Sequence, residues 1–154
     1  MLEPGFKFNL TDMAAALGLG QLARLHELNQ RRAALAELYR AELRDVCEVR
    51  PLRVPETTTE HSWSLFVVRL LDNPAGITRD QLMEQLKERG IGTGLHFRAV
   101  HLHAYFRQNP QLWRGELPQT EWCSERILSL PLFPDMNDDD PRRVVTTIKE
   151  IIGS

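Results

Sequence analysis

The segment from His61 to Leu71 has apolar side chains on both of its alternating faces. Trp63, Leu65 and Val67 fall on one side, and Phe66, Val68 and Leu70 fall on the other. A strand that is apolar on both sides is typical of the centre of a sheet, where each face is covered by other elements. The segment therefore predicts a central strand, with further strands beside it and helices packed against it.

A long helical pattern precedes this strand. Thr11 or Asp12 can begin it as the N-cap, and leucines at helical spacing continue as far as Leu43. Glycine weakens a helix interior by about 1 kcal/mol relative to alanine, so a bend is expected near Gly20 or Asn29. The segment is predicted to be one long amphipathic helix.

The elements after the central strand alternate between helix and strand. Thr78 and Gln81 form a capping box, which begins a helix that ends at Gly90. The remaining expectations are a loop around Pro51 and Pro55, a strand from Ile91 to Phe97, irregular chain over 99–117, a helix from Thr120 to Ile127, a strand from Leu128 to Leu132, and a last helix that Asp140 caps with Pro141 at its first position. This order predicts a small α/β layer.

Composition and charge exclude several classes of protein. A chain of 154 residues is expected to form one domain, and its 19 basic and 21 acidic residues are spread along it. It has no basic block that would bind nucleic acid. Two cysteines without a CxxC pair predict free thiols, and the sequence shows no signal peptide and no membrane-length apolar run. These features predict a cytoplasmic protein.

A cluster of polar side chains lies in the stretch GIGTGLHFRAVHLHAYF. It holds His96, Arg98, His101, His103 and Tyr105. A metal site is disfavoured because no nearby Asp, Glu or Cys completes a ligand set. The other interpretations are a loop with structurally bonded histidines, or a loop that lines a pocket for an anionic substrate. The preceding glycines follow a helix and enter a strand, which is the wrong order for a phosphate-binding loop.

The three lysines differ in their surroundings. Lys87 and Lys149 lie in predicted helices and are expected to be exposed, as are Glu121 and Glu125. Lys7 is flanked by two aromatic residues, so it is either structural or directed at a bound cofactor. No nucleophile elbow supports serine-hydrolase chemistry.

Three separated stretches carry a family resemblance; they read GFKFNLTDMAAALGLGQLARLHELNQRR, KERGIGTGLHFRAVH and TEWCSERILSLPLFPDM. The chain resembles the DegT/DnrJ/EryC1/StrS sugar-nucleotide aminotransferases over essentially its whole length, but only their C-terminal part. Within the family it looks most like the branch that transfers an amino group from glutamate to a UDP-4-keto-pentose in lipid A modification, a lipopolysaccharide change linked to antibiotic resistance.

The resemblance implies the C-terminal small domain of a fold-type I transferase that depends on pyridoxal 5'-phosphate. Residues 1–45 would form an interdomain and dimer-interface turn and long helix, and 46–154 the small α/β domain. The implied partners are an N-terminal cofactor domain, a second subunit of a homodimer, a UDP-sugar and glutamate or 2-oxoglutarate. The Schiff-base lysine lies upstream in the family, so the chain alone would be inactive. The alternative is a non-catalytic interaction module derived from such an enzyme.

The resemblance also assigns site residues. Lys7 and Asn9 match the turn that reaches the cofactor phosphate of the neighbouring subunit, although the family commonly has an arginine there. His96 and Arg98 match the loop that borders the sugar-nucleotide and amino-acid pocket, and His101 closes this loop. No catalytic residue and no metal ligand is expected within the chain.

Overall fold

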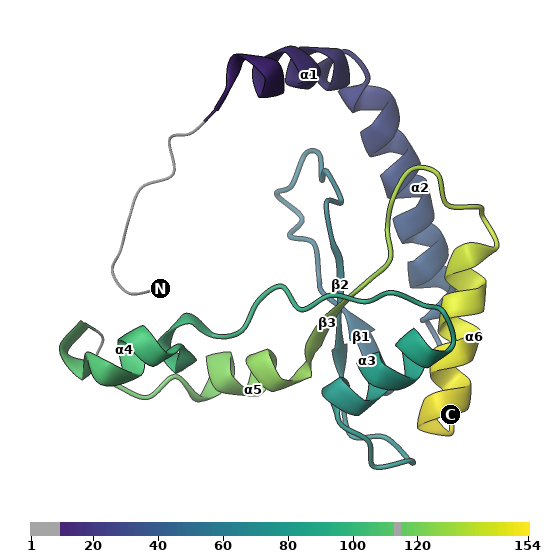
Figure 1. The fold of residues 1–154 in the computed structure, drawn as a ribbon. Helices are drawn as coiled ribbons and strands as arrows, with labels where there is room; N and C mark the ends of the chain where they lie inside the picture. Colours follow the sequence, from purple (N-terminus) through teal and green to yellow (C-terminus); the bar gives the residue numbers. More distant parts are fainter. Residues whose placement is uncertain (1–9, 113–114) are drawn as a thin grey trace.

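The computed structural model describes residues 10–112 and 115–154, with a three-stranded sheet at its centre (Figure 1). The strands are β1 (Val49–Pro51), β2 (Phe66–Leu70) and β3 (Ile127–Leu130), paired antiparallel in the order β1-β2-β3. Val68 of β2 lies opposite both Pro51 and Leu128, which fixes the register. β2 is therefore the central strand, as its two apolar faces predicted.

The ends of the sheet differ from the sequence expectation in two places. Pro51, expected in a loop, ends edge strand β1, a position where proline's missing N–H is tolerated. β2 begins at Phe66 and not at His61. Trp63 has a φ of +48°, which lies outside the extended region and interrupts the alternating pattern before the strand begins.

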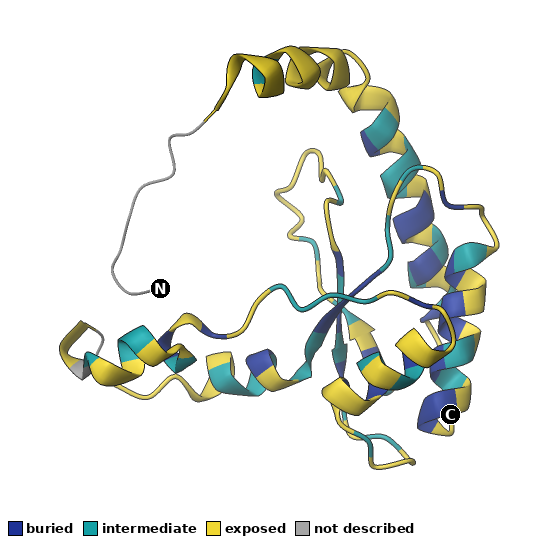
Figure 2. Ribbon diagram, viewed as in Figure 1, coloured by how far each residue is buried: buried dark blue, intermediate teal, exposed yellow. Residues whose placement is uncertain are grey.

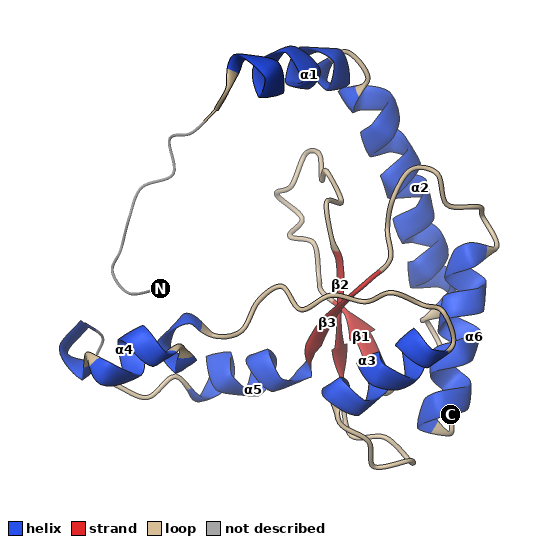
Figure 3. Ribbon diagram, in the orientation of Figure 1, coloured by secondary structure: helices blue, strands red, loops and turns tan. Residues whose placement is uncertain are grey.

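The helices are α1 (Asp12–Leu22), α2 (Leu25–Glu42), α3 (Arg79–Glu88), the short α4 (Ala104–Gln108), α5 (Pro118–Arg126) and α6 (Asp140–Ile152), with 3-10 turns at Val100–Leu102 and Pro110–Leu112. α6 packs against both α2 and α3. α4 and α5 extend away from the sheet on the side opposite α2 and α6 (Figures 1 and 3). α4 and the two 3-10 turns lie within 99–117, which was expected to be irregular.

The predicted long helix is in fact two helices. The break lies at Ala23 and Arg24, between α1 and α2, and not at Gly20 or Asn29. At the start of α1, the Thr11 side chain accepts a hydrogen bond of 3.2 Å from the backbone N–H of Ala14. The helices meet at an angle (Figure 1), so α1 leads away from the body that α2 joins.

The expected cap of α6 is also different. Asp139 and not Asp140 holds the N-cap position, and its side chain makes no capping bond. Asp140 instead accepts a hydrogen bond of 2.7 Å from the backbone N–H of Asn137, in the turn before the helix. Pro141 is therefore the second residue of the helix and not the first, and it is tolerated there because the N–H groups of the first turn have no partner within the helix.

The predicted strand from Ile91 to Phe97 is wrong. Only Gly94 pairs with a strand, through a single bridge to Ser129 of β3. After this bridge the backbone N–H of Ala99 bonds to the side chain of Ser124 in α5, so side chains replace the strand ladder. The segment is a loop that runs along β3 and α5.

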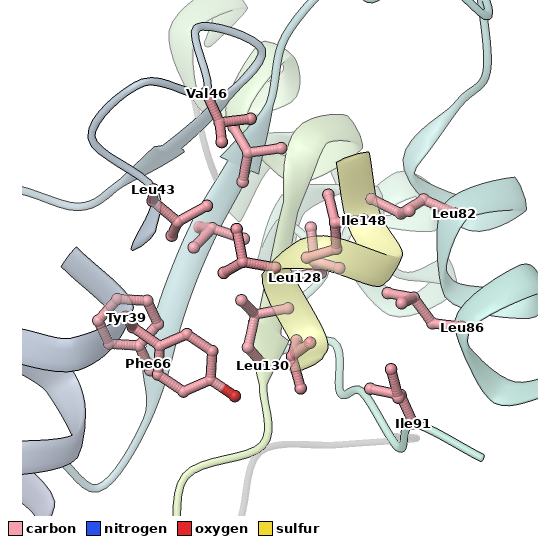
Figure 4. Packing of buried hydrophobic residues seen from close by; sticks show 14 of the residues in the cluster. Tyr39, Leu43, Val46, Phe66, Leu82, Leu86, Ile91, Leu128, Leu130 and Ile148 are labelled. Atoms are coloured by element: carbon pink, nitrogen blue, oxygen red, sulfur yellow. The ribbon is translucent and has the colours of Figure 1, made fainter. Parts of the chain in front are cut away.

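One hydrophobic core joins the sheet to α2, α3 and α6 (Figure 4). α2 contributes Tyr39, whose ring stacks on Phe66 of β2 with centroids 4.8 Å apart and whose hydroxyl donates to the carbonyl of Pro131 at 2.9 Å. The capping box of Thr78 and Gln81 is present at the start of α3, as predicted. Further core residues are Leu35, Leu43, Val46, Val49, Val68, Leu82, Leu86, Leu128, Leu130, Val145, Ile148 and Ile152.

α1 lies outside this core. None of its residues is buried, and Figure 2 shows it exposed along almost its whole length. The exposed fractions of Met13 and Leu17 are 80% and 74%. Among the residues that the structure describes, no helix has the length and apolar character needed to cross a membrane.

Candidate functional site

The candidate site is built on the loop of residues 94–103, which carries three of the predicted site residues. Its first anchor is the backbone of Gly94, which exchanges hydrogen bonds of 3.0 and 2.7 Å with Ser129. The second anchor is His96, whose Nδ1 lies 2.9 Å from Oγ of the same serine. Both anchors fix the start of the loop on β3.

The second half of the 94–103 loop is anchored on α5. The backbone N–H of Ala99 donates to the hydroxyl of Ser124 at 2.9 Å, and both residues are buried. His101 is 7% exposed, and its Nε2 lies 3.0 Å from a carboxylate oxygen of Glu121. The loop therefore runs antiparallel to β3 at its start and to α5 at its end. Its position depends on contacts of four loop residues, which are Gly94, His96, Ala99 and His101.

Arg98 projects from the anchored loop and is exposed. It lines a pocket of about 570 Å³. The other lining residues are Arg79, Asp80, Leu95, Leu102, Arg107, Glu121, Ser124 and Glu125. The pocket carries three arginines and three acidic residues, and two of the arginines, Arg98 and Arg107, are exposed. Exposed guanidinium groups suit carboxylate or phosphate ligands, which they bind through paired N–H donors.

A buried arginine supports one wall of this pocket. Arg79, at the start of α3, is 8% exposed, and its Nη1 donates to the carbonyls of Ser124 and Ile127 at 3.2 and 2.7 Å. Its Nε donates to Asp80 at 2.5 Å. Arg79 therefore ties the end of α5 to α3 and helps to hold the surface on which the 94–103 loop rests.

The three predicted substrate residues have different surroundings. Arg98 lines the pocket, His96 is bound to Ser129, and His101 is buried against Glu121. The predicted cofactor residues Lys7 and Asn9 lie outside the described residues. Glu121, expected on a solvated helix face, in fact holds His101.

Sequence reasoning missed the residues that support the loop. Ser124 and Ser129 are 5% and 4% exposed, and both hydroxyl groups bond to the loop. A signal was present for Ser129, because it is a lone hydroxyl between two leucines in a predicted strand. A polar group in such a position needs a hydrogen-bond partner. The partner itself lies 33 residues away and could not be identified from spacing.

The described residues do not form a complete pyridoxal phosphate site. The two lysines among them, Lys87 on α3 and Lys149 on α6, are absent from the pocket that Arg98 lines. The described part of the chain therefore offers no amine at this pocket for an imine with the cofactor. Its two cysteines, Cys47 and Cys123, are free thiols, and no group of three or more His, Cys, Asp or Glu within it is arranged to hold a metal ion.

Comparison with known proteins places these features in a family. The model of the DegT/DnrJ/EryC1/StrS aminotransferase family matches residues 1–149. Among solved structures, DesV of S. venezuelae, in complex with a ketimine intermediate, is 32% identical, with a TM-score of 0.78 over 95% of this chain and 38% of its own. DesI, solved in the presence of its TDP-sugar product, is 30% identical, with a TM-score of 0.80 over 94% of this chain and 36% of its own.

A third solved structure is Spr1654 of Streptococcus pneumoniae in its PLP form. It is 25% identical, with a TM-score of 0.79 over 99% of this chain and 38% of its own. The chain thus spans 36% to 38% of the length of these three structures. Because the family model matches nearly all of the sequence, the chain belongs to the DegT/DnrJ/EryC1/StrS aminotransferase family.

Proposed function

We propose that this chain supplies the C-terminal segment of a pyridoxal-phosphate-dependent sugar-nucleotide aminotransferase. The observation that carries the proposal is the anchored 94–103 loop, which holds Arg98 at a pocket with a second exposed arginine, Arg107. Both substrates of such a reaction are anions, since a sugar nucleotide carries a diphosphate and the amino donor carries carboxylates. The family match and the likeness to DesI, which was solved in the presence of its TDP-sugar product, support the same assignment.

Within the family, we propose the activity of UDP-4-amino-4-deoxy-L-arabinose–oxoglutarate aminotransferase. It moves the amino group of glutamate to a UDP-4-keto-pentose in the cytoplasm, as a step of lipid A modification. The support is the likeness of the stretch GTGLHFRAVH to this branch. The two exposed arginines suit the diphosphate and the dicarboxylate.

The cofactor and its lysine are proposed to come from an N-terminal domain, in a homodimer. Residues 1–45 form the interdomain and dimer-interface segment in this proposal, and 46–154 form the small domain. Its support is α1, which presents apolar side chains such as Leu17 and Leu19 to solvent. Lys7 and Asn9, just before this helix, are proposed to bind the cofactor phosphate, and His101 to close the substrate loop. Without the N-terminal domain the chain is proposed to be inactive.

The proposal is tested by steady-state kinetics of the longer protein that contains this segment. Arg98→Ala is expected to raise KM for glutamate or the sugar nucleotide, because a hydrogen bond to a charged group contributes about 1.5–3 kcal/mol, or roughly 10- to 100-fold. Its cofactor content should stay normal. Lys7→Met should instead lower cofactor retention. Arg142→Ala, which alters an exposed arginine on α6, is the control and should match the wild type.

Two results would contradict these assignments. Wild-type kinetics in Arg98→Ala would remove that residue from the substrate site. Full cofactor retention in Lys7→Met would remove Lys7 from the phosphate site, and each result stands independently of the other.

A further inference from the structure

The imidazole of His96 is confined on two sides. On one side Nδ1 lies 2.9 Å from Oγ of Ser129. On the other side the ring lies against Gly94, where an ideal Cβ atom would be 2.5 Å from Cε1 and 3.1 Å from Nδ1. Nδ1 is thus engaged by the protein, and within the described residues Nε2 of His96 has no hydrogen-bond partner.

Gly94 is required by the ring and not by the backbone. Its φ lies outside the left-handed region, so an alanine there meets no backbone strain. The Cβ of that alanine would instead occupy the space of the imidazole. Gly92, two residues earlier, also has an ordinary φ, and a Cβ there would have no heavy atom within 4 Å. The two glycines therefore form a matched pair for substitution by alanine, because only the Cβ added at Gly94 would meet His96.

Ser129 provides a hydroxyl where the strand is otherwise apolar. It lies between Leu128 and Leu130 in β3 and is 4% exposed. A buried hydroxyl is costly unless it forms a hydrogen bond, and His96 supplies that bond here. The backbone of Ser129 also binds Gly94, so one residue sets both the chain and the ring.

We infer that Gly94 and Ser129 are positioning residues, which hold the His96 ring so that Nε2 is the nitrogen presented to the substrate. With Nδ1 occupied, the imidazole contacts a ligand or moves a proton only through Nε2. The substrate contact rests on the proposed aminotransferase function. The locked ring rests only on the contacts among Gly94, His96 and Ser129.

The lock is tested by NMR of the 154-residue chain with ¹⁵N-labelled histidine. In the wild type, the two His96 nitrogens should report one fixed tautomer. Ser129→Ala and Gly94→Ala should both move these shifts toward the tautomer mixture of a free imidazole, whereas Gly92→Ala should reproduce the wild type. The amide shifts of β2 and α6 show whether each variant is folded. If Ser129→Ala does not fold, the comparison of Gly94→Ala with Gly92→Ala decides the test. Unchanged His96 shifts in Gly94→Ala overturn the lock.

The substrate contact is tested by kinetics of the longer protein. His96→Ala should lower kcat/KM. Ser129→Ala should lower it too, because misplacing a group that contacts the substrate can reduce the rate by up to about 100-fold. The double variant should be no worse than His96→Ala, because Ser129 acts through the ring. If the effects of His96→Ala and Ser129→Ala on kcat/KM add in the double variant, or if His96→Ala has wild-type kinetics, the contact between His96 and the substrate is overturned. Transamination by the wild type would still support the proposed function in either case. Absence of transamination in the wild type contradicts the function itself, and the NMR comparison still decides the lock.

Discussion

Tyr39 connects α2 to the sheet through a buried aromatic ring and one hydrogen bond. Its side chain is fully buried, and the hydroxyl donates to the carbonyl of Pro131 at 2.9 Å. Burial raises the pKa of the Tyr39 hydroxyl well above its usual value, because the phenolate would lose its hydration, and the negative charge of Asp140 adds to this effect. The folded chain therefore favours the neutral, protonated hydroxyl of Tyr39 over the phenolate.

This raised pKa predicts a loss of stability at alkaline pH. The unfolded chain releases the Tyr39 proton near pH ~10, before the folded chain does, so the stabilisation is complete below that pH and declines above it. In urea unfolding, the wild type should lose stability faster than Tyr39→Phe as the pH rises past about 10. At neutral pH the variant should lose about 0.5–1.5 kcal/mol with its hydrogen bond.

Tyr105→Phe, in the short helix α4, is the control for removing a tyrosine hydroxyl away from the core. Equal alkaline slopes for the wild type and Tyr39→Phe would contradict the assignment of this pH dependence to Tyr39.

Contacts between neighbouring residues were predictable at this scale, and contacts between distant residues were not. Thr78 and Gln81 form their capping box as expected, because the residues that make it lie within one turn. The bond from His96 to Ser129 joins residues 33 positions apart. No local pattern encodes such a distance, so the support of the site emerged only from the fold.

At the scale of elements, helices with clear caps and the central strand were predicted, and weaker elements were not. A bend was expected near Gly20 or Asn29, but the break falls at Ala23 and Arg24, where α2 turns to join the core. The segment from Ile91 to Phe97 has the composition of a strand but pairs only at Gly94. The side chain of Ser129 in β3 bonds to His96 in this segment, and that of Ser124 in α5 bonds to the backbone N–H of Ala99 just after it. Neither contact can be read from the sequence of the segment itself.

The exposure of α1 predicts self-association of the isolated chain. Its exposed apolar residues include Met13, Leu17, Leu19 and Leu22. Contiguous apolar surface of this kind favours association in water. Light scattering over a range of concentrations should show oligomers for the wild type, and Leu17→Glu should shift the population toward monomer.

The control for this experiment is Thr146→Glu, which places the same charge at an exposed position of α6. It should associate like the wild type. A wild-type chain that stays monomeric at high concentration would contradict an interface role for α1.

At the scale of the whole molecule, the chain combines a well-packed sheet layer with two outlying parts. α2, α3 and α6 enclose the core, whereas α1 and the α4–α5 region extend from it in different directions (Figures 1 and 2). The chain corresponds to 36% to 38% of the solved relatives DesV, DesI and Spr1654. The described residues place three arginines and no lysine at the pocket that Arg98 lines.

The central claim is that this segment completes an enzyme that aminates a sugar nucleotide. Its most direct test supplies ¹⁵N-glutamate, pyridoxal phosphate and a UDP-4-keto-pentose to the longer protein and, in parallel, to the 154-residue chain, and measures ¹⁵N in the sugar by mass spectrometry. We predict ¹⁵N in the amino sugar with the longer protein and none with the chain alone. A cofactor-loaded longer protein that transfers no ¹⁵N to the sugar, or a chain that transfers it unaided, would contradict the account.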